Sequence, residues 1–189
     1  MKTVKIPGFL HDVFGEKQTW ATIITIFACS IALTGTIYFL YPEMVEGIPL
    51  WRSLIALILM WDIFAGCVAN FTASTSNFYA ERPLNRIVFI SIHVHILVVA
   101  FCLNEDIGYA TAVWAFTIAG AFLVNSLVQP QRQVFLAGLL LTIGIAGQLL
   151  WRDVEPYMLV TGMLFMLKVL YSFSVNHYGH SAQKKGGRG

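Results

Sequence analysis

The stretch that decides the fold is RIVFISIHVHILVVAFCL, residues 86–103. Apart from Arg86 at its start, the strongly polar ionisable residues in it are His93 and His95, and nearly all the rest is apolar. Eighteen residues extend about 27 Å as a helix, close to the ~30 Å hydrocarbon thickness of a bilayer. The stretch therefore indicates a membrane helix that carries two titratable rings near its middle.

The whole chain has the composition of a membrane protein. It contains 189 residues, of which 57% are hydrophobic and 12% are charged. A soluble domain of this size could not bury so much apolar surface. Six apolar stretches of about the spanning length recur along the chain, and they are too long for the strands of a membrane barrel. They cover residues 18–40, 49–71, 86–103, 107–128, 133–151 and 157–176. The predicted fold class is an all-α integral membrane protein with a bundle of six transmembrane helices.

Basic residues are divided unequally between the two sides of these helices. With the N-terminus inside, nine lysines and arginines fall in cytoplasmic segments and two fall outside. The inner set is Lys2, Lys5, Lys17, Arg82, Arg86, Arg132, Lys184, Lys185 and Arg188, and the outer set is Arg52 and Arg152. Because cytoplasmic loops carry the excess of positive charge, both termini are predicted to be cytoplasmic.

The chain then divides into a membrane domain and two flanking segments. Residues 18–176 form the membrane domain, residues 1–17 a cytoplasmic N-terminal segment, and residues 177–189 a basic cytoplasmic tail. In the N-terminal segment Phe9, Leu10, Val13 and Phe14 share one helical face, which is typical of a short interfacial helix, with an irregular segment as the alternative. The basic tail is a topology signal, so we expect membrane lipids and not nucleic acid as partners. The expected location is the plasma (inner) membrane, and oligomerisation stays open.

Four ionisable side chains are predicted to lie in one layer near the middle of the membrane. Asp62 and Lys168 each lie eleven residues from an aromatic residue at the outer edge of their span, which places both about 16 Å deep. His93 and His95, counted from the inner end of their own span, reach a similar depth. An isolated charge at this depth costs ~2.5–3.5 kcal/mol, so an Asp62–Lys168 ion pair is expected.

Helical periodicity separates the two histidines. Asp62 lies on a stripe of small residues that includes Ala65, Gly66 and Ala69, so this face is predicted to point into the bundle. Two residues along an ideal helix correspond to about 200° around its axis, so the histidines cannot both face one point. His95 lies on the more polar face and is predicted to join Asp62 and Lys168. His93 completes the candidate central site by its depth, but it lies on a more apolar face and is expected to bond a neighbouring helix.

A second group of polar residues is predicted at the inner end of the bundle. Amides and hydroxyls here could line a vestibule, with two arginines as partners for an anion or a lipid headgroup. The alternative is that they cap helix ends. The candidate vestibule consists of Asn70, Thr72, Asn77, Arg82, Arg86, Asn125 and Asn176.

The sequence leaves the function open among three classes. The favoured hypothesis is a proton- or ion-coupled transporter or channel for a small solute, with Asp62 as the binding carboxylate, Lys168 as its competing partner and His95 as a gate or proton relay. The alternative is a membrane-embedded enzyme acting on a lipid or prenyl substrate, with or without a metal. A structural or assembly protein without its own site is the third. The chain has no HExxH, GxSxG or Walker motif, so neither a metal site nor catalytic residues are assigned, and the cofactor is unknown.

Overall fold

The computed structural model describes residues 2–179, so positions 180–189 of the predicted basic tail lie outside the described residues. Within them, six helices are long and apolar enough to cross a membrane. These spans are Trp20–Leu40, Leu50–Ala69, Pro83–Leu103, Ile107–Ser126, Pro130–Leu150 and Pro156–Phe173. The predicted all-α, multi-pass bundle is thereby confirmed, whereas the orientation of its ends stays a prediction.

Four of the spans are single helices, and two are built from two pieces. The single helices are α2 (Trp20–Leu40), α3 (Leu50–Ala69), α7 (Ile107–Ser126) and α8 (Pro130–Leu150). The third span consists of α5 (Pro83–Ile92) and α6 (His95–Leu103), and the last consists of α9 (Pro156–Met166) followed by a π-helix, Leu167–Phe173. Proline occupies the first turn of α5, α8 and α9, where a missing backbone N–H costs no helical hydrogen bond.

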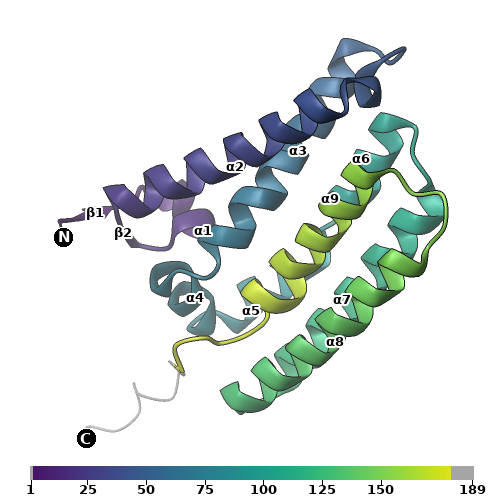
Figure 1. Cartoon of the computed structure of the whole chain (residues 1–189). Coiled ribbons are helices and arrows are strands. Elements are labelled where there is room, and N and C mark those ends of the chain that lie inside the picture. The colour runs from purple at the N-terminus through teal and green to yellow at the C-terminus, as the bar shows by residue number, and fades with distance from the viewer. Residues whose placement is uncertain (1, 180–189) are drawn as a thin grey trace, which may run out of the picture.

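The last span lies at the centre of the bundle. α9 and the π-helix pack against α3, α7 and α8, while α2 packs mainly on α3 at one edge (Figure 1). Of the last span 61% is buried, against 17% of α2 and 22% of α8, so α2 and α8 offer most of their surface to lipid. We call the end with the loops after α2, α6 and α8 the outer end, following the predicted orientation, and the opposite end the inner end.

The N-terminal segment folds against the inner end. Strands β1 (Thr3–Lys5) and β2 (Lys17–Thr19) form an antiparallel pair with Thr3 opposite Thr19. Between them, a helical stretch comprises a 3-10 turn, Gly8–Leu10, and α1 (His11–Phe14). The short helix is therefore present, but its predicted apolar face is split: Phe9 is 83% exposed, whereas Phe14 is 6% exposed and packs with residues of α2 and α3. The two strands were not predicted.

A short helix at the inner end holds this segment in place. α4 (Ala73–Ala80) follows α3 and is capped by Thr72, whose hydroxyl accepts a hydrogen bond from the Thr75 backbone N–H at 3.4 Å. The Thr75 hydroxyl donates to the carbonyl of Val13 at 3.1 Å, and the Tyr79 hydroxyl donates to the carbonyl of Asp12 at 3.1 Å. The N-terminal segment thus lies across the inner end of α3 and beside α5.

Candidate functional site

Lys168 and Asp62 form a close ion pair between the last span and α3. The ammonium Nζ lies 2.6 Å from Asp62 Oδ2 and 3.3 Å from the Asp62 carbonyl oxygen. The lysine side chain runs across Gly66, one turn further along α3, where a methyl group would fall 2.8 Å from Lys168 Cδ. The stripe of small residues on α3 therefore admits the lysine stem, which is how a residue of the bundle centre reaches Asp62.

His95 is the third member of the cluster. Its Nδ1 lies 3.4 Å from Asp62 Oδ2, the same oxygen that Lys168 contacts. The side chains of His95 and Asp62 are 26% and 42% exposed, whereas that of Lys168 is 3% exposed. One carboxylate oxygen therefore faces a buried cation on one side and a titratable ring on the other, and a proton on His95 would create a second cation beside it.

His93 joins the same cluster, as its place in the predicted layer indicates, but the prediction that the two histidine rings face apart is wrong. The rings of His93 and His95 lie 5.0 Å apart. The prediction assumed a continuous helix, but α5 ends at Ile92 and α6 begins at His95. His93 has ψ 81° and Val94 has ψ 11°, so the chain turns between the two rings. The 200° separation of an ideal helix does not apply across this break.

Two ring N–H groups satisfy the carbonyls that the break sets free. The backbone N–H of His93 bonds Ile90, and the carbonyl of Phe89 instead accepts from His93 Nδ1 at 2.5 Å. Because a carbonyl only accepts, Nδ1 carries the proton. The carbonyl of His93 accepts from Trp114 Nε1 of α7 at 3.0 Å. The predicted bond to a neighbouring helix is thus made by the backbone of His93, while its ring bonds its own helix.

A cavity of about 160 Å³ surrounds the four ionisable groups. We call it the central cavity. Asn70 and Gly66 of α3 line it, and Asp12 and Val13 of the N-terminal segment close its inner side. A second cavity of about 380 Å³, here the inner groove, is lined by Tyr79, Asn85 and Val88 and shares Asp12, Phe89 and Ile92 with the first. The two cavities therefore adjoin along α5, from the inner end to mid-membrane.

Sequence reasoning missed the contribution of the N-terminal segment to the cavity. Asp12 accepts from Tyr79 through its carbonyl and, at 3.3 Å, through its carboxylate. Burial, followed by the charge of Asp12, raises the pKa of Tyr79 well above its usual range, so its hydroxyl remains a donor. Asp12 is one of two acidic residues in the N-terminal segment, and no periodic pattern in the sequence relates it to residues of α3 and α5.

The candidate vestibule residues are divided among several local environments. Asn70 is buried and lines the central cavity. Thr72 caps α4. The Arg82 guanidinium pairs with Glu16 at 2.8 Å. Both residues of this pair line a surface pocket of about 320 Å³, which Asn77 also lines. Arg86 is buried and donates to the Phe173 carbonyl at 2.9 Å. Asn125 is half-buried near the end of α7, and the Asn176 backbone N–H donates to Gln133 at 2.8 Å.

Neither a metal-ligand set nor a likeness to known proteins assigns the chemistry of this site. In the described part of the chain, no group of three or more His, Cys, Asp or Glu side chains has the arrangement that could hold a metal ion. Comparison of the chain with protein-family models, with curated proteins and with solved structures found no match. The chemistry of the site therefore has to be argued from its own geometry.

Proposed function

We propose that the protein is a proton-coupled transporter or proton channel of the plasma (inner) membrane, with Asp62 as its proton-binding carboxylate. The observation that carries this proposal is the sharing of Asp62 Oδ2 between Lys168 at 2.6 Å and His95 at 3.4 Å. Ionisable residues at mid-membrane are costly, and they commonly mark ion pathways and proton relays. A carboxylate with two competing cationic partners has two alternative states, which a coupled transporter requires.

The irregular backbone beside the cluster supports the same class. Non-helical backbone at membrane depth is tolerated where it is buried in protein or lines a water-filled cavity, and discontinuous helices commonly carry the binding sites of transporters. Here the break between α5 and α6 supplies His93 and His95, and the π-helix Leu167–Phe173 supplies Lys168. Short π-helical segments inside α-helices occur frequently at functional sites.

The proposed cycle moves one proton between His95 and the pair. In the resting state Asp62 is ionised, Lys168 is charged and His95 is neutral. A proton that arrives on His95 makes it a second cation 3.4 Å from the shared oxygen, so the carboxylate moves toward the imidazolium and takes up its proton, and the Asp62–Lys168 contact weakens. Return of the proton restores the original pair. The adjoining inner groove supports proton access from the inner end in this conformation.

Proton flux into liposomes that contain the purified protein tests the proposal. A pH-sensitive dye trapped inside reports the flux while a potassium gradient and valinomycin set the membrane potential. We expect wild-type flux well above that of empty liposomes, and at least about tenfold less in Asp62→Asn because no carboxylate remains to bind the proton. The matched control is Asp153→Asn in an outer loop, where the positive φ of 59° suits asparagine as well as aspartate.

The same flux measurement also has an outcome that contradicts the proposal. Wild-type flux no faster than that of folded Asp62→Asn, at any pH between about 5.5 and 8 where histidine titrates, would exclude a proton pathway through this residue.

The enzyme alternative needs converging metal ligands or an activated nucleophile. Among residues 2–179 no metal-binding group of three such side chains is found, and no specific observation favours that alternative or a purely structural role.

A further inference from the structure

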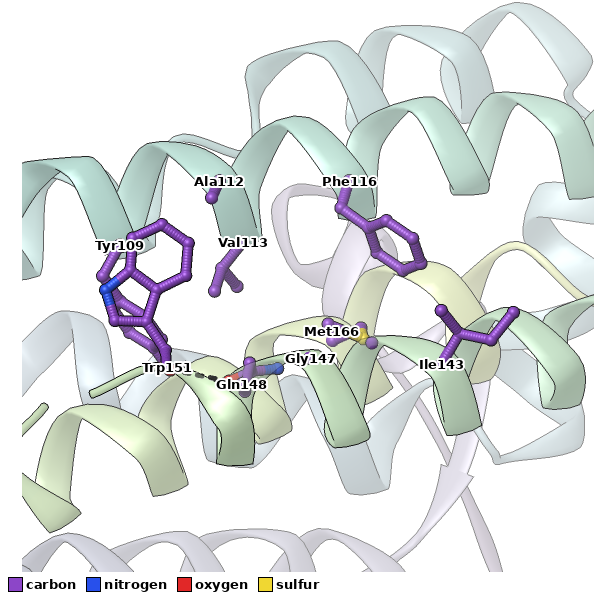
Figure 2. Close-up of a pocket in the computed structure, with 10 residues that line it drawn as sticks. Tyr109, Ala112, Val113, Phe116, Ile143, Gly147, Gln148, Trp151 and Met166 are labelled. Carbon is purple, nitrogen blue, oxygen red and sulfur yellow. Dashed lines mark hydrogen bonds between the residues drawn. The ribbon is translucent and has the colours of Figure 1, made fainter.

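A separate pocket opens between α7 and α8, on the side of the bundle away from Asp62. Its volume is about 360 Å³. Tyr109 and Trp151 lie at one end, and Phe116 and Ile143 lie toward the other (Figure 2). Its mouth faces outward, because Ile143 is 51% and Trp151 42% exposed. In a membrane this mouth meets lipid, and the volume is within the range of about 300–1,000 Å³ that is typical of small-molecule sites.

Small residues create this pocket. At Gly144 a methyl group would overlap the thioether of Met166 and approach Phe116 Cε1 to 2.9 Å, so the glycine lets Met166 form the floor. At Gly147, one turn from the end of α8, a methyl group would meet nothing within 4 Å. Glycine at 147 therefore leaves open a space at the pocket wall that the first atom of a side chain would enter without meeting a neighbour.

A buried polar pair stands at the floor of this apolar pocket. Gln148 is 3% exposed, and its Oε1 accepts from the Tyr109 hydroxyl at 2.7 Å. This bond turns the amide so that Nε2 points away from Tyr109 and along the pocket (Figure 2). Nε2 has no hydrogen-bond partner among the residues that the structure describes. Glutamine is costly to bury beside lipid unless its donors are satisfied, so the pocket calls for an occupant with an acceptor oxygen.

The depth of Gln148 below the membrane surface indicates which kind of acceptor oxygen lies at the level of its Nε2. Trp151 directly follows α8, and its Nε1 donates to Asp106 in the neighbouring loop at 3.3 Å, a position typical of the aromatic belt at the membrane surface. Gln148 lies three residues below it, or about 4.5 Å. Ester carbonyls of a phospholipid lie at this level, just beneath the headgroups. From Trp151 to Ile143 the pocket descends eight residues, or about 12 Å, along the direction of an acyl chain.

We infer that this pocket binds one phospholipid of the leaflet at the outer end, with an acyl chain between α7 and α8 and its ester carbonyl accepting from Gln148 Nε2. The lateral mouth admits a molecule that is already in the bilayer, and its apolar walls match a hydrocarbon chain. The unpaired Nε2 carries two N–H groups, and the ester carbonyl accepts from one of them. This inference does not rest on the proposed proton transport, because none of the pocket residues belongs to the central cavity.

Native mass spectrometry of the detergent-solubilised full chain tests the inference with two lipids. Dioleoyl phosphatidylcholine carries ester carbonyls, and its dioleyl diether analogue has the same chains without them. The wild type should bind the diester about fivefold more tightly than the diether, the ratio expected from one net hydrogen bond of about 1 kcal/mol. In Gln148→Leu the two lipids should bind equally, while Gly147→Leu should lose this bound lipid of either kind.

The matched control is Gly138→Leu, on the same helix but outside the pocket, where an added methyl group meets only Tyr171 at 3.9 Å. It should keep the wild-type preference, which separates this pocket from general lipid adhesion. Equal binding of diester and diether by the wild type, a comparison that needs no variant, would overturn the inference. So would wild-type lipid binding in folded Gly147→Leu, or stoichiometric displacement of the diester by an isoprenoid quinone.

Discussion

Removing either member of the Asp62–Lys168 pair should destabilise the fold, and by unequal amounts. The Lys168 side chain is 3% exposed and that of Asp62 is 42% exposed. Asp62→Asn leaves an ammonium group in an apolar interior, which we expect to cost about 3 kcal/mol, as for a charge at mid-membrane. Lys168→Met leaves a carboxylate that reaches the cavity and keeps His95 at 3.4 Å, so its expected cost is about 1 kcal/mol.

The double variant isolates the interaction. In Asp62→Asn/Lys168→Met no charge remains in the pair, and we expect a loss of only about 1 kcal/mol, because neutral replacement of a buried ion pair is often well tolerated. Independent effects would sum to about 4 kcal/mol. The expected coupling is therefore about 3 kcal/mol, at the upper end of the range for residues in contact.

Equilibrium unfolding in mixed micelles with increasing sodium dodecyl sulfate, followed by circular dichroism at pH 8, measures these differences. A parallel cycle on the exposed Glu16–Arg82 pair, whose side chains are 54% and 34% exposed, serves as the control and should give a coupling below about 1 kcal/mol. Strictly additive losses at Asp62 and Lys168 would refute the reasoning. A larger loss in Lys168→Met than in Asp62→Asn would refute the assignment of the lysine as the more deeply buried partner.

Three further predictions concern topology and pH. In a background without the native cysteines, a membrane-impermeant thiol reagent added outside should label Glu43→Cys but not Gln131→Cys, and the reverse pattern would invert the orientation. His95→Gln should flatten the pH dependence of proton flux between about pH 6 and 7.5, while His93→Gln should lower thermal stability and keep the pH profile; equal profiles would contradict the division of roles. Burial lowers the pKa of His177 below its ordinary 6.5, so the folded state disfavours protonation and the free energy of unfolding should fall as the pH drops below that value. His177→Gln should lose this part of the fall in a melting series from pH 8 to about pH 5.

Membrane physics made the bundle and the ion pair predictable from sequence. Apolar length alone determines six spans, since every backbone group inside a bilayer needs a partner and a helix provides it. Counting residues from the membrane surface placed Asp62 and Lys168 at one depth, and Gly66 indicated a close approach on the correct face of α3. The contact of Lys168 Nζ with Asp62 Oδ2 at 2.6 Å follows from that shared depth and that open face.

Tertiary contacts made the rest unpredictable. The N-terminal segment reaches the cavity through hydrogen bonds from Thr75 and Tyr79 to backbone carbonyls, which any sequence of residues could offer. The break between α5 and α6 has no local signal, because residues 86–103 contain neither proline nor glycine. The unpaired donor of Gln148 has no signal in the sequence either, because a single glutamine in an apolar helix commonly forms a hydrogen bond with a neighbouring helix.

The break resolves what two histidines one residue apart can do in a membrane helix. On a continuous helix one of them would face away from the site, and a buried ring there would need a partner of its own. Here the His93 ring bonds the carbonyl of Phe89, and Trp114 bonds the carbonyl of His93, so side-chain donors replace the bonds that the helix loses. That repair lets the chain turn and bring His95 to 3.4 Å from Asp62. We therefore propose that His93 is a positioning residue and that His95 is the titratable partner it positions. A single histidine at either position could not supply both the bent backbone and the ring beside the carboxylate.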